Sequence, residues 1–198
     1  MKKVVFLFLL TQFAFSQQKF ERDSVIQFQK KMNEHYADSV KSPLKKKDLA
    51  VFTALEFFPI NENYFVQAKF IRTKKEKPFE MKTTTSRKPI YVKYGELHFK
   101  IDGIPCQLNV YQNVEFSKID KYKNSLFLPF TDYTSGVESY GGGRYIDHEI
   151  QKGNNWIVDF NQAYNPYCAY NEVYSCPIVP KENDLKVEIK AGVKTFKK

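Results

Sequence analysis

A glycine-rich segment at residues 129–147 combines the residue types that hold anions. It contains four of the chain's eight glycines, three carboxylates, several hydroxyl side chains and one arginine, Arg144. Neighbouring glycines allow backbone N–H groups to converge on an anion, and the Arg144 guanidinium can bind a carboxylate or phosphate through two hydrogen bonds. The glycine spacing matches neither the dinucleotide fingerprint nor the P-loop, so no nucleotide is inferred. The alternative is a bulged turn in which Arg144 pairs with Asp132, Glu138 or Asp147.

A second dense segment, residues 159–177, is rich in asparagine, tyrosine and proline and includes two of the three cysteines. This composition is typical of a long ordered loop packed by its own aromatic side chains. In an exported protein Cys168 and Cys176 would form a disulfide that closes a short loop, which leaves Cys106 as a buried thiol on a strand. A reactive thiol or a metal ligand is the alternative role for these cysteines.

Together the two segments predict one polar, tyrosine-rich pocket that binds a small anionic or carbohydrate-like ligand. Arg144 is the expected anion partner, and an Arg144 side chain sealed in a buried ion pair would contradict this role. The expected ligand-binding residues are Asp132, Glu138, Tyr140, Gly142, Gly143, Arg144, Tyr145, Asp159, Asn161 and Tyr164.

The familiar enzyme motifs are missing from the sequence, which has no Gly-x-Ser-x-Gly, His-Glu-x-x-His or Cys-x-x-Cys. Of the three histidines, His35 and His98 are interpreted as surface residues. His148 lies between two carboxylates, but neighbours on a strand point to opposite faces and cannot share one metal. We therefore expect no metal site and no cofactor.

Two other functions remain open beside ligand binding. A hydrolase could draw its acid and base from the carboxylates of the two segments, and Cys168 is a weaker candidate nucleophile. These carboxylates are Asp132, Glu138, Asp147 and Asp159. In a purely structural envelope protein, the dense segments would be a stabilised loop and nothing more.

Alternation of apolar and polar residues indicates the elements that must position these segments. It is cleanest at residues 97–101 and 185–190, where every second side chain is apolar, as in strands with one buried face. Further strands are expected at residues 64–72, 90–94, 107–111, 126–130, 144–150 and 156–160, with a hairpin turn at Asp102-Gly103. No long helix separates the strands, so we predict a mainly β fold: one antiparallel sandwich or partly open barrel at residues 42–198.

The first 16 residues have the features of a secretory signal peptide. Lys2 and Lys3 precede an unbroken apolar run at residues 4–10, and Ala14-Phe15-Ser16 is a small-x-small cleavage signal. The apolar run is too short to span a bilayer. We expect cleavage after Ser16 and an exported chain, periplasmic or secreted, with no transmembrane segment.

An N-terminal helical segment is expected at residues 17–41. Val25, Phe28, Met32 and Tyr36 recur at helical spacing, which predicts an amphipathic helix at residues 21–36 that covers the core. A short second helix is expected to start at Asp48, as its cap, and to run through Val51 and Leu55.

Composition and charge exclude some classes of protein. With 42% hydrophobic and 16% aromatic residues the chain can bury a sizeable core, so intrinsic disorder is excluded. The formal net charge of +9 comes largely from small lysine clusters in expected loops and tails, which favours solvated surface over a nucleic-acid groove. We expect no nucleic-acid partner, and an anionic envelope component ranks second to ordinary surface charge.

Several short stretches resemble the bacterial domain-of-unknown-function family 1684. They lie at residues 77–81, 83–85, 94–95, 140–145, 159–161, 163–170, 175–177 and 191–192. The resemblance covers about residues 42–194 and includes both dense segments. Because that family has no established activity, the resemblance implies a common fold and a shared feature at the two segments, and no catalytic roles.

Overall fold

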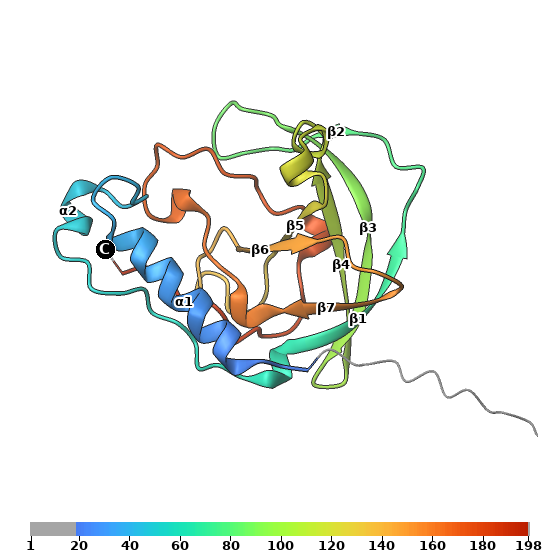
Figure 1. Cartoon of the computed structure of the whole chain (residues 1–198), viewed down its shortest axis with the longest axis horizontal. Coiled ribbons are helices and arrows are strands. Elements are labelled where there is room, and N and C mark those ends of the chain that lie inside the picture. The colour runs from blue at the N-terminus through green and yellow to red at the C-terminus, as the bar shows by residue number, and fades with distance from the viewer. Residues whose placement is uncertain (1–18, 198) are drawn as a thin grey trace, which may run out of the picture.

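One antiparallel sheet, curled into a half-barrel, dominates the computed structural model, which describes residues 19–197 (Figure 1). The predicted signal peptide lies outside the described residues. The strands are β1 (Phe65–Arg72), β2 (Phe79–Glu80), β3 (Ile90–Ile101), β4 (Ile104–Asn113), β5 (Ser125–Phe130), β6 (Arg144–Glu149) and β7 (Asn155–Asp159). Their order is β6-β5-β4-β3-β1-β7, and β2 pairs with β3 at one end. The predicted mainly β fold, in its partly open barrel form, is confirmed.

Strand β3 shows how the sequence specifies this sheet. Leu97, Phe99 and Ile101 are buried along one face, as the alternation predicts, and the expected strands at 90–94 and 97–101 are one continuous strand. A bulge between Lys93 and Gly95 joins them, and the ring of Phe70 would lie 2.4 Å from a Cβ at Gly95. Bulges increase the local twist of a strand, which helps the sheet to curl.

The predicted hairpin turn at Asp102-Gly103 is also confirmed. Both residues have positive φ angles, 49° and 80°, and Ile101 pairs with Ile104 across the turn. This is the two-residue turn whose twist matches that of antiparallel strands.

The strand predicted at residues 185–190 is not formed. Its Leu185, Val187 and Ile189 are buried in the core, which explains the alternation, but its backbone pairs with a loop. The Leu185 N–H donates to the Thr131 carbonyl at 2.8 Å, and the Tyr133 N–H donates to the Val187 carbonyl at 3.0 Å. The segment is an extended cover over the core, outside the sheet.

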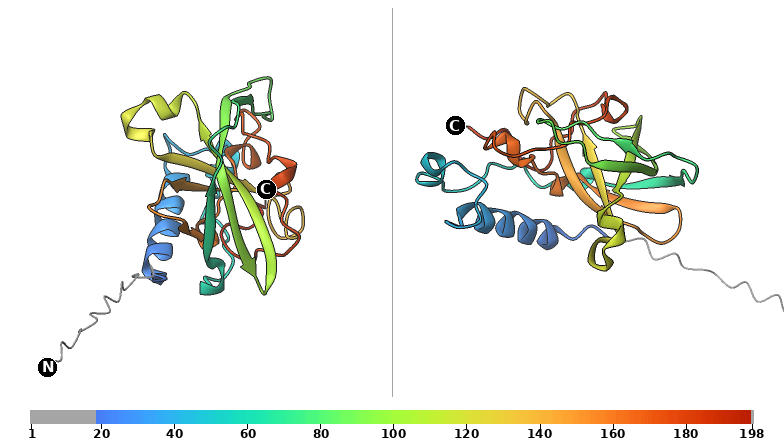
Figure 2. Two further views of the ribbon diagram at one scale, coloured as in Figure 1. Left: turned by 90° about the vertical axis from the view of Figure 1, so that its right-hand side faces the viewer. Right: turned by 90° about the horizontal axis from the view of Figure 1, so that it is seen from above.

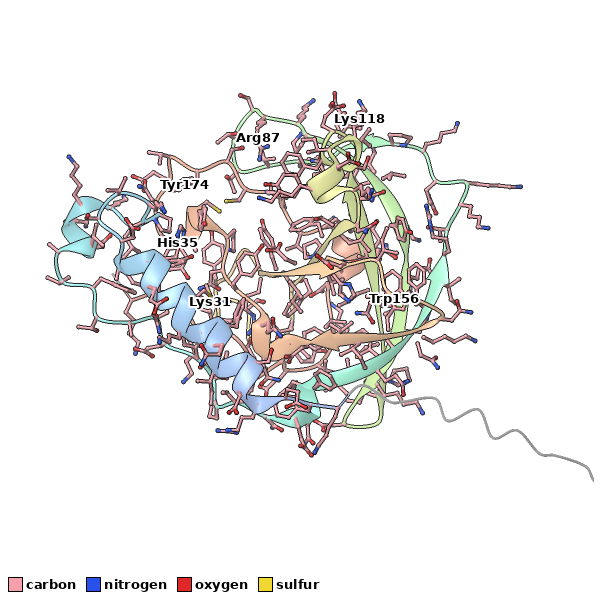
Figure 3. The ribbon with its side chains drawn as sticks, viewed as in Figure 1. Lys31, His35, Arg87, Lys118, Trp156 and Tyr174 are labelled. Carbon is pink, nitrogen blue, oxygen red and sulfur yellow. The ribbon has the colours of Figure 1, made fainter. Side chains whose placement is uncertain are left out.

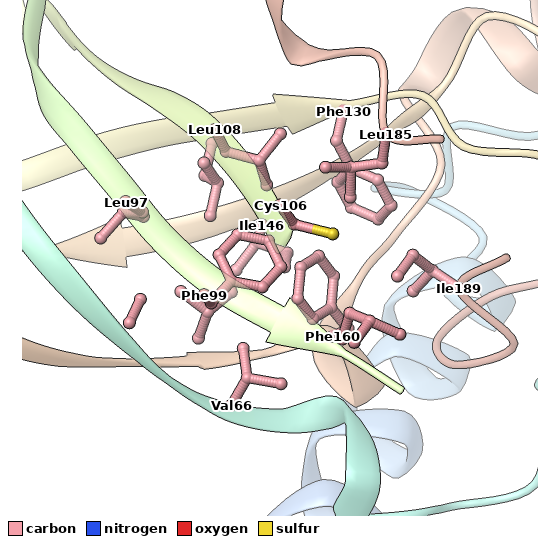
Figure 4. Packing of buried hydrophobic residues seen from close by; sticks show 14 of the residues in the cluster. Val66, Leu97, Phe99, Cys106, Leu108, Phe130, Ile146, Phe160, Leu185 and Ile189 are labelled. Carbon is pink, nitrogen blue, oxygen red and sulfur yellow. The ribbon is translucent and has the colours of Figure 1, made fainter. Parts of the chain in front are cut away.

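The main core lies inside the half-barrel and is rich in aromatic rings (Figure 4). The indole of Trp156 stacks on the ring of Phe70 with centroids 3.7 Å apart, and Phe160 packs against Phe99 and Phe130. Cys106 points into this core, as predicted for a strand thiol.

Helix α1 (Arg22–Ala37) lies across the molecule from β3 and β4 (Figures 1 and 2). It confirms the predicted amphipathic helix, and its Val25 and Tyr36 are buried. Helix α2 (Lys46–Leu49) is shorter than expected: Asp48 lies within it and does not cap it, and Val51 is exposed beyond its end. Within residues 19–197 no helix has the length and apolar character needed to cross a membrane.

Candidate functional site

Arg144 is sealed in a closed ion pair with Asp132. Both side chains are completely buried, with Nη2 of Arg144 3.1 Å from Oδ1 of Asp132. Nη1 donates to the Ala191 carbonyl at 2.5 Å, and Nη2 also donates to the Ile189 carbonyl at 2.8 Å and to the Thr134 hydroxyl at 3.2 Å. Nε has no hydrogen-bond partner among the described residues. The prediction that Arg144 binds a ligand anion is therefore wrong, and the alternative of pairing with Asp132 is what the structure has.

The glycines of the first segment build a tight turn. Gly143 has a φ of +87°, and a Cβ at this position would lie 2.6 Å from the carbonyl oxygen of Phe130. A Cβ at Gly142 would lie 2.5 Å from the ring of Tyr140. Glu138 lies at the surface, with its carboxylate 3.5 Å from Nζ of Lys190. Backbone conformation and close packing therefore account for the glycines at positions 142 and 143 without a bound anion.

Asp159 and Asn161 hold loops together. Oδ1 of Asp159 accepts hydrogen bonds from the backbone and side-chain nitrogens of Asn161 at 3.0 and 2.8 Å, and Oδ2 accepts from Gln162 at 3.0 Å. The Asn161 amide in turn bonds the backbone N–H and carbonyl of Asn61 at 2.9 and 3.0 Å. This exchange fixes the loop after β7 to the chain that enters β1.

The two dense segments meet, as predicted, at the outer edge of β6. The backbones of Tyr145 and Tyr164 exchange two hydrogen bonds of 2.9 Å, so the loop after β7 adds itself to the sheet. This pairing brings the side chains of Tyr145, Asp147 and Tyr164 to one cavity between the sheet edge and α1.

This cavity, called here the α1 cavity, has a volume of about 440 Å³. Its walls are Phe28, Lys31, Met32, His35, Tyr36, Tyr145, Asp147, Tyr164, Pro166, Tyr167, Ser175, Cys176 and Pro177. Lys31 and His35 enter it from α1 (Figure 3). Of the predicted site residues, Tyr145, Tyr164 and Cys176 line the cavity, whereas the other candidates lie elsewhere.

Two hydrogen-bonded pairs provide the polar groups of the α1 cavity. The Tyr164 hydroxyl donates to Oδ1 of Asp147 at 2.7 Å, and Nε2 of His35 lies 3.0 Å from the Tyr167 hydroxyl. Desolvation by the surrounding protein raises the pKa of Asp147. Burial together with the Asp147 charge raises the pKa of Tyr164 well above its usual value. Tyr164 therefore stays protonated and donates to the carboxylate.

The α1 wall is the part of the site that sequence reasoning missed. His35, interpreted as a surface residue, lines the cavity instead. The signal was present in the helical spacing, because Phe28, Met32 and His35 lie on one face of α1 beside Tyr36. Asp147 was named only as one of four candidate carboxylates and as a possible partner of Arg144.

Cys168 and Cys176 lie together as predicted, but both are free thiols in the structure. The backbone N–H of Cys168 donates to Sγ of Cys176 at 3.2 Å, and the Tyr140 hydroxyl lies 3.9 Å from Sγ of Cys168. A hydrogen bond from the Cys176 thiol, with a further one from Tyr140, lowers the pKa of Cys168 to about 6. The disulfide stays a prediction.

His148 has a structural environment that is separate from the cysteines. Its ring stacks on Trp156 with centroids 5.4 Å apart, and its Nδ1 and Nε2 lie 2.8 and 2.9 Å from the carbonyl oxygens of Glu149 and Ile157, to one of which the neutral ring donates. Burial lowers its pKa. In the part of the chain that the structure describes, no cluster of three histidine, cysteine or acidic side chains could hold a metal ion.

A smaller cavity of about 180 Å³ lies on the other side of Asp147. It is also lined by Glu149, Asp159 and Gln162. Asp147 thus lines both cavities, whereas of the other three candidate carboxylates only Asp159 lines either one.

Comparison with known proteins gives a family but no activity. The model of the family described as "Protein of unknown function (DUF1684)" matches residues 50–194. An uncharacterised protein of Haloarcula marismortui, solved by solution NMR, has a similar structure, with a TM-score of 0.68 and 28% sequence identity over 87% of this chain and 93% of that one. No curated protein matches the sequence. The predicted resemblance to this family is confirmed, and the chain belongs to the DUF1684 family.

Proposed function

We propose that this chain is an exported protein that binds a small molecule in the α1 cavity. The observation that carries the proposal is the Asp147–Tyr164 pair, whose oxygens lie 2.7 Å apart at a cavity of about 440 Å³ with aromatic walls. Ligand sites are typically cavities of roughly 300–1,000 Å³ with apolar walls and a few converging polar groups. The α1 cavity has this size and composition.

The lining favours a ring-shaped, hydroxylated ligand that carries a negative group. The rings of Tyr145, Tyr164 and Tyr167 offer surfaces against which the apolar face of a sugar-like ring can pack. The free lone pairs of the Asp147 carboxylate can accept hydrogen bonds from ligand hydroxyls. Lys31 supplies a positive charge on the α1 wall and could serve as the anion partner, the role predicted for Arg144 from the sequence. A sugar acid or a phosphorylated sugar matches this set.

Binding is favoured over hydrolysis because the candidate carboxylates have separate tasks. Asp132 neutralises buried Arg144, Glu138 lies beside Lys190, and Asp159 bonds the amides of the loop after β7. Asp147 alone of these four lines the α1 cavity.

A hydrolase is the second candidate function, and one observation favours it. Asp147 and Asp159 both line the smaller cavity, and the raised pKa of Asp147 is the direction that suits a general acid. A screen of ester, phosphoester and glycoside substrates with the wild type and an Asp159→Asn variant tests this function. Equal background rates for both proteins would eliminate it.

The binding proposal is tested with Asp147→Asn and with Asp120→Asn as the matched control. The same chemical change is made in both, but the Asp120 side chain is fully exposed at a surface turn. Sugar acids and phosphorylated sugars are titrated by NMR or calorimetry against each protein. A charge-assisted hydrogen bond contributes about 1.5–3 kcal/mol, so Asp147→Asn should weaken binding by roughly 10- to 150-fold, whereas Asp120→Asn leaves it unchanged. Equal affinity of the two variants, or no binding of either probe class to the wild type, contradicts the proposal.

Export is proposed from residues 1–16 and has its own test. The full chain is expressed in a bacterium with an outer membrane and fractionated, and the N-terminus of the product is sequenced. We expect Gln17 as the first residue in the exported fraction. An unprocessed chain that remains in the cytoplasm would contradict export without affecting the ligand site.

A further inference from the structure

The Cys168–Cys176 pair has features that a purely structural disulfide does not need. Cys168 lies on the short helix η5 (Tyr167–Ala169) and is partly exposed, while Cys176 is buried and lines the α1 cavity. The two thiols are within hydrogen-bonding reach of each other, and the Cys168 N–H also donates to Sγ of Cys176 at 3.2 Å. One thiol is thus accessible to a reactant, and the second lies behind it within reach of the first.

Both cysteines are held in place by their surroundings. The Cys176 N–H donates to Oγ1 of Thr84 at 3.1 Å, and the Thr84 N–H donates to the Cys176 carbonyl at 2.9 Å. On the other side the Ala169 N–H donates to the Pro166 carbonyl at 2.9 Å, which fixes the turn that carries Cys168. The two thiols therefore lie side by side in the folded reduced protein. Formation of the Cys168–Cys176 bond does not require the loop that carries them to fold first.

The groups that face the pair favour a thiolate at Cys168. The Cys176 thiol and the Tyr140 hydroxyl can both donate a hydrogen bond to its sulfur, and these donors lower its pKa to about 6. The same contact with Cys168 raises the pKa of Cys176, against a smaller effect from the positive charge of Arg87. Tyr145 and Tyr167 also face the pair, and both have raised pKa values, so they stay neutral. Interactions that stabilise the thiolate stabilise the reduced state relative to the disulfide.

We propose that Cys168 and Cys176 form a reversible dithiol–disulfide couple that exchanges with low-molecular-weight disulfides, with Cys168 as the attacking thiolate and Cys176 as the resolving thiol. This activity is independent of the proposed ligand binding. It differs from a structural disulfide because the bond forms and breaks within the folded protein.

The exchange proceeds in two balanced steps. The Cys168 thiolate attacks one sulfur of a disulfide RSSR, the S–S bond breaks, and RS⁻ leaves and takes up a proton. Cys176 then loses its proton and attacks Sγ of Cys168, which forms the Cys168–Cys176 bond and releases a second RS⁻. Two protein thiols are oxidised while one RSSR is reduced to two RSH, and the reverse reaction consumes two RSH.

Cys106 provides the internal contrast. It lies in the main core with its thiol 3.6 Å from the Ile104 carbonyl, and desolvation raises its pKa. A buried thiol of this kind is inert to exchange. A Cys106→Ser background therefore leaves only the proposed couple to be measured.

The first test equilibrates the Cys106→Ser protein in mixtures of reduced and oxidised glutathione, traps free thiols and determines the products by mass spectrometry. We expect one reversible transition in which the protein loses two hydrogens. In a Cys176→Ser variant we expect a mixed disulfide of glutathione on Cys168, because no resolving thiol is present. A Cys168→Ser variant should form neither product. Circular dichroism confirms that each variant is folded.

The second test measures the pH dependence of alkylation by iodoacetamide. The Cys168 rate should be half-maximal at about pH 6, and Tyr140→Phe should move this midpoint upward. A midpoint near the usual value of about 8.5 for a free cysteine would overturn the proposal. So would a disulfide that excess reduced glutathione leaves intact, or thiols that no glutathione mixture oxidises.

Discussion

Removal of the Asp132 carboxylate is expected to destabilise the protein more than any surface change. Asp132 accepts hydrogen bonds from Arg144 at 3.1 Å, from the Thr134 hydroxyl at 3.0 Å and from the Ile189 N–H at 2.6 Å. In Asp132→Ala the guanidinium of Arg144 keeps its charge and its burial but loses its counterion. The Ile189 N–H loses its acceptor at the same time.

The magnitude follows from the burial of the pair. Truncation of one partner of a buried ion pair costs about 3–5 kcal/mol, whereas an exposed pair contributes about 0–1 kcal/mol. Glu115→Ala is the matched control, because Glu115 and Lys118 form a salt bridge of 2.9 Å with both side chains exposed. In Asp132→Ala/Arg144→Met both charges of this buried pair are removed. The loss in this double variant should therefore be about 1–3 kcal/mol smaller than the sum of the two single losses.

The assay is urea unfolding followed by the fluorescence of Trp156, the one tryptophan of the chain, which is buried against Phe70. A loss of less than about 1 kcal/mol in Asp132→Ala, comparable to that of Glu115→Ala, would refute a sealed charge at Arg144. Strict additivity in the double variant would refute the coupling between the two side chains.

Two further predictions concern the turn and the buried histidine. Gly143→Ala should lower the free energy of unfolding by about 1–3 kcal/mol or more, because its φ of +87° is unfavourable for alanine and the new Cβ meets the Phe130 carbonyl. The control Gly103→Ala has a similar φ but open space around the new Cβ, so its loss should be smaller. Equal losses in urea unfolding would contradict this packing argument. Burial lowers the pKa of His148 below the unfolded value of about 6.5. Near pH 6 the unfolded chain therefore binds more protons than the folded chain, and the free energy of unfolding should fall as the pH drops through this range. His148→Gln should remove this part of the pH dependence, and an unchanged difference between pH 7.5 and pH 5.5 would contradict it.

Alternating apolar residues predict most of the sheet because each strand buries one face. Leu97, Phe99 and Ile101 show the rule, since their side chains enter the core and their backbones pair with β4. The same rule fails at residues 185–190. There the apolar side chains are also buried, but the Ile189 N–H donates to the Asp132 carboxylate instead of to a strand. An alternating pattern of side chains indicates which face is buried, but it does not indicate the hydrogen-bond partners of the backbone.

The site was predictable as a place but only partly as a set of residues. Unusual composition identified the two segments, and both contribute to the α1 cavity through Tyr145 and Tyr164. Arg144 could not be assigned in the same way. Its partners are a carboxylate 12 residues before it, the Thr134 hydroxyl and two carbonyls at Ile189 and Ala191. Only the folded chain shows that two of its three guanidinium nitrogens already have acceptors. The local sequence shows that a residue is charged, whereas segments distant in the sequence determine whether that residue is buried.

The two walls of the α1 cavity differ in how they relate to the family. Tyr145, Asp147 and Tyr164 lie within the residues that the DUF1684 model matches, whereas α1, with Lys31 and His35, lies before them. Under the proposed function, the hydroxyl-binding carboxylate thus belongs to the sheet edge within the matched region, and the positive charge belongs to a helix before it. A change of ligand charge between members can then arise by substitution on α1 while the packed edge of β6 stays intact. Because Lys31 is exposed and its substitution leaves no buried partner unsatisfied, such a change costs little stability. Under the proposed function, ring recognition and charge recognition therefore lie on separate elements, and only the first lies within the residues that the family model matches.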